Sequence, residues 1–309
     1  MKRFSEKQIG LLSSAELRSA RGRLLYWFLF FLLVLMVIIT VFPALWMILT
    51  AFKTTQEIYT STEILPENFT LVLAVNQIVE AWKMLRLGRS MLNTLGVSAV
   101  NAVVAILIPG MAGYAISKRK SRGIGVIFGM VVWTMMMPAT VQLVPRYISF
   151  ISFPLVVDDG MRSVTNVNVL NTYLPLWLGA AANSFNLILF KNAFDAVPNT
   201  LLDAARIDGC NEFRIFFLLM LPLCKATVFF VSVGTLSVAW SDYLNPYLIL
   251  SEADLLTTPA KLFTLQGLPG IPTNVYMMGL VFACIPPALI YIFFQRRMTG
   301  GVMMGAVKG

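Results

Sequence analysis

The 309-residue chain is too apolar for an ordinary soluble domain, since 58% of its residues are hydrophobic, 13% are charged and 22 are phenylalanine. It contains no histidine, which excludes histidine-based hydrolases, imidazole metal sites and histidine proton relays. The net charge of +9 does not indicate a nucleic-acid partner, because no soluble segment combines a basic patch with stacking aromatics.

Charge-free runs predict where the chain crosses a membrane. Five runs lack Asp, Glu, Lys and Arg, and each exceeds the roughly 20 residues that a helix needs to span a bilayer. They are residues 24–52, 90–117, 123–145, 163–190 and 262–295. A sixth span is expected between residues 215 and 249, interrupted by Lys225 near one end and Asp242 toward the other. The sequence therefore predicts an all-α integral membrane protein with six transmembrane helices.

Basic residues predict the orientation of these spans. The segments 1–23, 118–122, 191–214 and 296–309 hold 16 of the 24 Lys and Arg residues, whereas the alternate segments hold 7. Because short loops rich in Lys and Arg stay in the cytoplasm, both termini are expected to be cytoplasmic. This divides the chain into a cytoplasmic tail (1–23), a six-span domain (24–295) and a second cytoplasmic tail (296–309).

The first outer segment, residues 53–89, is long and carries four glutamates. Turn residues within it predict short helices rather than a further span. Contact with an extracytoplasmic partner protein is one expected role for this segment.

A polar insert, residues 191–217, separates two of the predicted spans. Thr200 and Asp203 stand three residues apart, a spacing that lets a hydroxyl and a carboxylate satisfy the free amides of a helix start. Gly209 is expected to end that helix, and Asn211 to cap the next one.

One face of the predicted insert helix is built around two methyl-sized side chains. Leu201, Ala204, Ala205 and Asp208 follow the i, i+3, i+4, i+7 spacing, so another backbone can approach this face closely. The charged residues around it require water or protein as surroundings. They are Asp203, Arg206, Asp208, Glu212 and Arg214. The pattern is typical of a docking surface, and an ordinary amphipathic loop between membrane helices is the alternative.

The insert closely resembles the EAA motif, the cytoplasmic loop signature of bacterial ABC importer permeases. That pattern reads EAA, three residues, Gly, nine residues, Ile, one residue, Leu-Pro. The matching positions are Asp203, Ala204, Ala205, Gly209, Leu221 and Pro222. Asp203 replaces the glutamate and Leu219 replaces the isoleucine, and both keep the chemical type. Ala226 stands where a second proline is usual, so any bend there depends on Pro222.

Other segments resemble the carbohydrate-uptake branch of the same family, in particular permeases of the maltose-transporter second-subunit type. Each match is weak alone, but their order and their distances from the insert make them specific together. They are Asn93–Leu95, Ala112–Ala115, the group Trp240, Asp242, Tyr243 and Pro246, and the ending Gly305–Gly309. Ser241 departs from the asparagine that is more usual there.

The resemblance implies the type I ABC importer permease fold, with a core permease module at about 86–295. It implies a non-catalytic subunit of the bacterial plasma membrane that imports an oligosaccharide or related sugar. The implied partners are cytoplasmic ATPase subunits that bind ATP and Mg²⁺, a second permease subunit in a heterodimer, and an extracytoplasmic solute-binding protein. The residues implied to couple this chain to the ATPase are Asp203, Ala204, Ala205, Arg206, Asp208, Gly209, Leu221 and Pro222.

Asp242 is the carboxylate that falls inside a predicted span, where insertion scales put its cost at roughly 2.5–3.5 kcal/mol. One interpretation places it near the outer interface with Trp240 and Tyr243 in an aromatic belt. The other interpretation is that Asp242 and Asn245 line the solute path and accept hydrogen bonds from sugar hydroxyls. Both interpretations stay open.

The sequence offers no catalytic or metal site. It has no GxxxxGK[ST] phosphate loop, so any ATP hydrolysis must occur on a partner. An ion-coupled secondary carrier would also have six spans, but it needs no docking surface and usually needs more than one intramembrane acid. A membrane scaffold subunit is the third interpretation.

Overall fold

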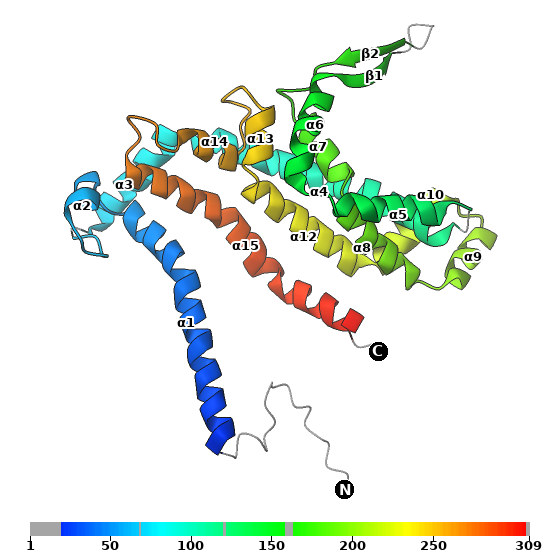
Figure 1. The fold of residues 1–309 in the computed structure, drawn as a ribbon, viewed down its shortest axis with the longest axis horizontal. Coiled ribbons are helices and arrows are strands. Elements are labelled where there is room, and N and C mark those ends of the chain that lie inside the picture. The colour runs from blue at the N-terminus through cyan, green and yellow to red at the C-terminus, as the bar shows by residue number, and fades with distance from the viewer. Residues whose placement is uncertain (1–19, 68, 120–121, 158–162, 307–309) are drawn as a thin grey trace.

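The computed structural model of the chain describes residues 20–67, 69–119, 122–157 and 163–306. The fold is mostly helical (Figure 1). Its helices in chain order are α1 (Ala20–Ala51), α2 (Thr55–Thr60), α3 (Leu71–Leu85), α4 (Leu87–Lys118), α5 (Ile124–Met135), α6 (Ala139–Ile151), α7 (Leu174–Ala181), α8 (Ser184–Asp195), α9 (Asn199–Ile207), α10 (Glu212–Arg214), the π-helix η2 (Ile215–Met220), α11 (Leu221–Leu223), α12 (Lys225–Ser241), α13 (Leu244–Ile249), α14 (Thr258–Leu265) and α15 (Thr273–Ala306).

Three of the predicted spans are single long helices. The runs 24–52 and 90–117 lie in α1 and α4, and most of the run 262–295 lies in α15. Two more candidate spans are bent: α5 meets α6 at 106°, and the segment from α10 to α11 meets α12 at 84°. Within the described ranges, length and composition support three membrane-crossing helices, or five if each bent pair is one span.

The predicted span at 163–190 is wrong as a single helix. Asn171 has a left-handed φ of 58°, and the helices that follow, α7 and α8, have 8 and 12 residues. The side chain of Asn183 caps α8 by accepting a hydrogen bond from the Asn186 amide at 3.0 Å. Asparagine favours turns and helix starts, so a run without charges can still contain breaks.

The start of this region is the second strand of a hairpin, which corrects the expectation of an all-α fold. The strands β1 (Phe153–Val157) and β2 (Ser163–Val167) pair antiparallel, with Phe153 opposite Val167. Figure 1 shows the hairpin projecting beyond α6 and away from the helices. The short helices expected between residues 53 and 89 are confirmed as α2 and α3.

α4 is the central helix of the fold, and it packs against α7, α8 and α12. Gly113 allows its closest approach, because a Cβ there would lie 2.9 Å from the backbone nitrogen of Lys191 on α8. The adjoining core contains Phe190 and Phe194 from α8 and Phe216 from η2. This core ties α4 to the insert.

Contacts place the insert and the later part of α15 at one end of the helices. Lys118 Nζ, in the last residue of α4, donates to the Val197 carbonyl at 2.6 Å. At the start of α12, the Phe229 ring lies 5.1 Å from that of Phe294 on α15, between centroids. This end is called the insert end below.

The opposite end gathers α2, α14 and the starts of α4 and α15. The hydroxyl of Thr55 donates to Asn274 Oδ1 at 3.1 Å, and Asn93 Nδ2 donates to the Asp254 carbonyl at 2.7 Å. The expected outer segments 53–89 and 250–261 therefore lie at this end, and the expected inner segment 191–214 lies at the insert end.

α1 stands apart from the other helices over most of its length (Figure 1). Its apolar side chains are largely exposed, from Leu24 at 74% to Ile48 at 38%, whereas Ala51 at its end is buried. Its packing partner is α15. Such an apolar, exposed helix suits a lipid environment.

The two predicted tails are described unequally. Residues 1–19 lie outside the described ranges, and α1 begins within the expected tail at Ala20. α15 continues through the expected carboxy-terminal tail as far as Ala306.

Candidate functional site

The insert contains the expected helix, but it starts differently from the prediction. The backbone of α9 begins after Pro198, which supplies no side-chain cap. Thr200 therefore lies inside the helix, and the Thr200–Asp203 capping pair is wrong. Proline is well suited to this position, because its fixed φ and missing N–H cost nothing at a helix start.

The end of α9 confirms the role of Gly209. Gly209 has a φ of +80°, its amide donates to the Arg206 carbonyl at 3.0 Å, and the Cys210 amide donates to the Ala205 carbonyl at 3.0 Å. These two bonds define a Schellman motif, which favours glycine in the left-handed position. The side chain of Asn211 then caps α10 by accepting from the Arg214 amide at 2.9 Å, as expected.

The faces of α9 divide into an inner and an outer set. Leu202 is buried and Ala205 is half-buried against the phenylalanine core. Leu201, Ala204 and Ile207 are exposed, and Ile207 is 87% exposed. Of the predicted docking face, Ala205 therefore lies at the inner edge, whereas Ile207 extends the outer face. Leu201, Ala204 and Ile207 thus give α9 an exposed apolar face, the type of surface that partner proteins bind.

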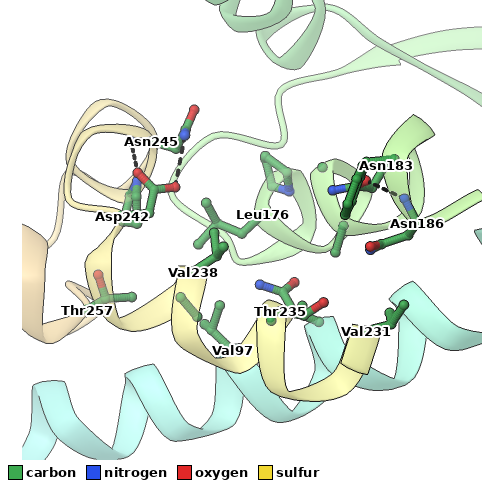
Figure 2. Close-up of a pocket in the computed structure, with 18 of the residues that line it drawn as sticks. Val97, Leu176, Asn183, Asn186, Val231, Thr235, Val238, Asp242, Asn245 and Thr257 are labelled. Atoms are coloured by element: carbon green, nitrogen blue, oxygen red, sulfur yellow. Dashed lines mark hydrogen bonds between the residues drawn. The ribbon is translucent and has the colours of Figure 1, made fainter. Parts of the chain in front are cut away.

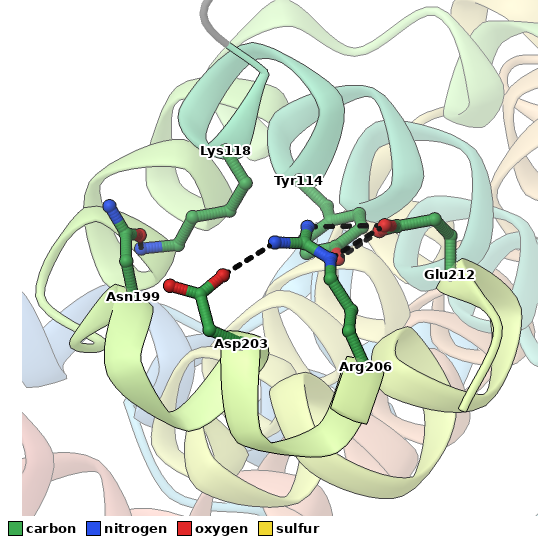
Figure 3. A network of polar contacts seen from close by, with 6 residues as sticks. All are labelled: Tyr114, Lys118, Asn199, Asp203, Arg206 and Glu212. Atoms are coloured by element: carbon green, nitrogen blue, oxygen red, sulfur yellow. Dashed lines mark hydrogen bonds and ion pairs between the residues drawn. The ribbon is translucent and has the colours of Figure 1, made fainter. Parts of the chain in front are cut away.

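A polar network joins the insert to the last turn of α4 (Figure 3). Glu212 Oε1 accepts from Arg206 Nε at 3.1 Å, and Glu212 Oε2 accepts from the Tyr114 hydroxyl at 2.5 Å. Arg206 also pairs with Asp203 at 3.0 Å. Burial works against the charge of Arg206, but the hydrogen bond and charge of Glu212, followed by Asp203, raise the pKa of its guanidinium. Arg206 therefore remains the cationic centre of the network.

The insert continues into α12 through an irregular helix. η2 is a six-residue π-helix, and a bend of 84° follows α11. Leu221 is half-buried against the core, while Pro222 is exposed. The turn falls at Cys224, two residues after Pro222, which agrees with the expected bend near that proline. π-Helical turns are frequent at functional sites.

A second candidate site is a cavity of about 400 Å³ (Figure 2). It lies between α4, α7, α8, α12 and α13. Its volume is in the range of small-molecule binding sites. Four carboxamides from three different helices or their caps line it. They are Asn101, Asn183, Asn186 and Asn245. Phe185 and Phe230 add aromatic surface.

Asp242 and Asn245, the two polar residues of the solute-path interpretation, both line this cavity. Asp242 follows the last residue of α12, and its carboxylate accepts two hydrogen bonds from Asn245. One comes from the backbone N–H at 3.2 Å and the other from Nδ2 at 2.9 Å. Asn245 Oδ1 in turn accepts from Arg146 Nη2 at 2.5 Å. The carboxylate is thus held by local hydrogen bonds and linked through an amide to a cation, which offsets the cost of its burial.

The other two residues predicted for the solute path lie elsewhere. Trp240 is buried at 5% exposure outside the cavity lining, and Tyr243 packs its ring 4.7 Å from that of Phe263. The aromatic side chains therefore stabilise the neighbouring helices, while the polar side chains face the cavity.

Two polar atoms of the cavity lining have no hydrogen-bond partner among the described residues. They are Asn101 Oδ1 and the hydroxyl of Thr257, which is 1% exposed. A buried polar group normally has a partner, so these atoms mark where a polar ligand or water would bind. The prediction missed both residues. Their signal in the sequence was weak: Asn101 is a lone carboxamide in an apolar run, and Thr257 lies in an outer segment.

In the described part of the chain, no three His, Cys, Asp or Glu side chains come together as metal ligands. The chemistry that the two sites offer is non-covalent. The insert end offers an exposed apolar helix with a charged border. The cavity offers amide, hydroxyl, aromatic and charged groups to a polar molecule, the charged groups coming from Arg146 and Asp242.

Comparison with known proteins gives the family. Residues 102–302 match the family described as binding-protein-dependent transport system inner membrane component. The chain is 29% identical over 279 residues to the arabinooligosaccharides transport system permease protein AraQ of Halalkalibacterium halodurans, covering 88% of this chain and 92% of the relative. It is 26% identical over 275 residues to the lactose transport system permease protein LacG of Rhizobium radiobacter, covering 87% and 92%.

The fold is also that of a solved transporter. A chain in the crystal structure of a bacterial ABC transporter involved in the import of the acidic polysaccharide alginate superposes with a TM-score of 0.73. The two chains are 19% identical, and the match covers 90% of this chain and 98% of the other. The chain therefore belongs to the family of binding-protein-dependent transport system inner membrane components, and it is a multi-pass protein of the bacterial plasma membrane.

Proposed function

We propose that the chain is the transmembrane permease subunit of an ATP-driven importer that takes an oligosaccharide from a binding protein. The family supports the import of a solute delivered by a binding protein. The named relatives carry arabinooligosaccharides and lactose, which supports a carbohydrate. In this proposal the chain is no catalyst, because partner ATPase subunits hydrolyse the ATP and bind its Mg²⁺.

The observation that carries the proposal is the construction of α9. Its inner face is fixed to the core by Leu202, while its outer face, with Leu201, Ala204 and Ile207, is uncovered. A helix that is held firmly on one side and bare on the other can transmit a displacement of whatever binds it. We assign the bare face to a cytoplasmic ATPase subunit, so that closure of the ATPases around ATP moves α9 as a rigid body.

The cavity is assigned to the solute path. Sugars present hydroxyl groups and weakly polar ring faces, and the cavity supplies carboxamides, a buried hydroxyl and two phenylalanine rings. A second permease subunit, different from this chain, is proposed to complete the path. An extracytoplasmic binding protein is proposed to deliver solute at the end that carries α2 and α14, with α9 and both termini cytoplasmic.

The test uses the complete complex, purified with its ATPase subunits by a tag on this chain and reconstituted into proteoliposomes with its binding protein. Arabinotriose and lactose serve as radiolabelled probes, because relatives carry sugars of these classes. The expected result is uptake of at least one probe that requires ATP and persists after proton and sodium gradients are collapsed.

Three outcomes would contradict the proposal. Uptake that follows an ion gradient without ATP identifies a secondary carrier. ATPase subunits that copurify without uptake of any oligosaccharide identify a scaffold. Labelling of an Arg206→Cys variant from outside intact cells would place the insert on the wrong side.

A further inference from the structure

The last turn of α4 is held to α9 at two separate points (Figure 3). Lys118 Nζ donates to the Val197 carbonyl at 2.6 Å and to Asn199 Oδ1 at 3.2 Å, at the start of α9. Tyr114 donates to Glu212 at 2.5 Å, just beyond the end of α9. Because Tyr114 and Lys118 are four residues apart, both side chains project from one face of α4. Two points of attachment fix the direction of α9 as well as its distance.

Glu212 is the residue that closes the second attachment. One carboxylate oxygen accepts from the Tyr114 hydroxyl, and the other accepts from Arg206 Nε at 3.1 Å. The carboxylate therefore links a membrane helix to the docking helix through two charge-assisted hydrogen bonds.

The two bonds differ in their exposure to water. Tyr114 is 8% exposed and packs edge-on against Phe194, at 6.1 Å between ring centroids. The ion pair of Arg206 with Glu212 is about half exposed, with side chains at 43% and 47%, so water and salt screen it strongly. The Tyr114 bond has one buried partner, so it is the less screened restraint of the two.

α4 also reaches the cavity. Asn101 lines the cavity and lies 13 residues before Tyr114, which is about 20 Å along an α-helix. At Gly113, between these two residues, α4 packs directly against the backbone of α8. A rotation imposed at Tyr114 therefore moves the Asn101 wall of the cavity without passing through the bend at Cys224.

We infer that Tyr114 and Glu212 are positioning residues, whose hydrogen bond makes α4 a direct lever between the docking helix α9 and the cavity wall. This inference rests on the proposed function, because it names the route by which ATPase closure changes access to the solute path. The spans that adjoin the insert in sequence, through α8 and α12, form the other route.

The experiment measures cavity access in the assembled complex. The parent carries Asn101→Cys as its single cysteine, with Cys210, Cys224 and Cys284 replaced by alanine, and is purified through a tag on the ATPase subunits. A polar maleimide labels this cysteine with and without nucleotide trapped by vanadate. If trapping makes a state populated at about 10% or less dominant, the labelling rate changes about tenfold.

Two variants test the attachment. Tyr114→Phe removes the hydroxyl and keeps the ring, and Glu212→Gln removes the charge and keeps the size. Both are expected to lose most of the nucleotide-dependent change in labelling while the ATPase subunits stay bound. The double variant should be no worse than Glu212→Gln alone, because the Tyr114 bond already ends on Glu212. Tyr59→Phe is the matched control, since its hydroxyl bonds to Thr273 at the opposite end, at 3.1 Å.

The outcomes separate the two proposals. A parent that shows no response to trapped nucleotide, or that fails to bring down ATPase subunits, contradicts the proposed function. A parent that responds, with variants that respond equally, contradicts the role of Tyr114 and Glu212. Because only assembled complexes are labelled, a loss of yield alone cannot imitate the expected result.

Discussion

Replacing Gly209 tests how far the docking surface depends on one backbone conformation. Gly209 has a φ of +80°, and a Cβ there would meet nothing within 4 Å. The cost of Gly209→Ala is therefore conformational rather than steric, about 1–2 kcal/mol for an L-residue in the left-handed region. If the variant avoids this cost by unwinding the end of α9, the docking-competent form becomes roughly 5- to 30-fold rarer.

The assay is the amount of ATPase subunit retained by the tagged permease as the ATPase concentration is varied. Gly209→Ala should weaken retention within that range, and Gly209→Asn should weaken it less, because asparagine tolerates the left-handed region better. Gly179→Ala in α7 is the control, since a Cβ there also meets nothing within 4 Å and its backbone is helical. Equal retention by Gly209→Ala and Gly179→Ala would refute the reasoning.

Three further predictions concern packing and the cavity. Gly113→Ala should lower the free energy of unfolding by about 1–3 kcal/mol through overpacking against α8, and this loss is measured as a lower melting temperature of the complex. Gly96→Ala on the same helix, where a Cβ meets open space, should not lower it. Thr257→Val should leave thermal stability unchanged or higher, since the hydroxyl has no partner among the described residues. If that hydroxyl binds the sugar, the variant should raise the sugar concentration needed for half-maximal uptake about 2- to 12-fold. Asp242→Asn, which keeps one acceptor for Asn245, should retain ATP-driven uptake within about tenfold, whereas an ion-coupled carrier would lose uptake entirely.

The sequence predicted the parts of the fold that depend on local composition. A continuous helix in lipid needs only a long apolar run, so α1, α4 and α15 followed from hydropathy. The left-handed end of α9 followed from Gly209, because one residue type dominates that position.

The breaks in residues 163–190 could not be predicted in the same way. The predicted spans were located by the absence of charged residues. Asn171 and Asn183 are uncharged, and they break the helix through their backbone preferences. The same limit explains the Thr200–Asp203 pair, because a spacing typical of a cap also occurs from the second residue of a helix that begins after Pro198.

The cavity lay beyond the reach of local patterns because its walls come from distant parts of the chain. Asp242 was found through its cost in a membrane, and Asn245 through its proximity in sequence. Asn101 and Thr257 meet them only after α4 and α12 pack together and the start of α14 folds over that end. The polar signal of each residue is ordinary when it is considered alone.

The pairing of α1 with α15 sets a constraint on biogenesis. α15 begins at Thr273, 222 residues after α1 ends at Ala51, and a ribosome adds that length in roughly 10–45 s at about 5–20 residues per second. For that interval the first hydrophobic segment resides in the bilayer without its final neighbour. Truncated nascent chains should therefore leave α1 free to diffuse laterally or to be captured by insertion factors until the last helix emerges.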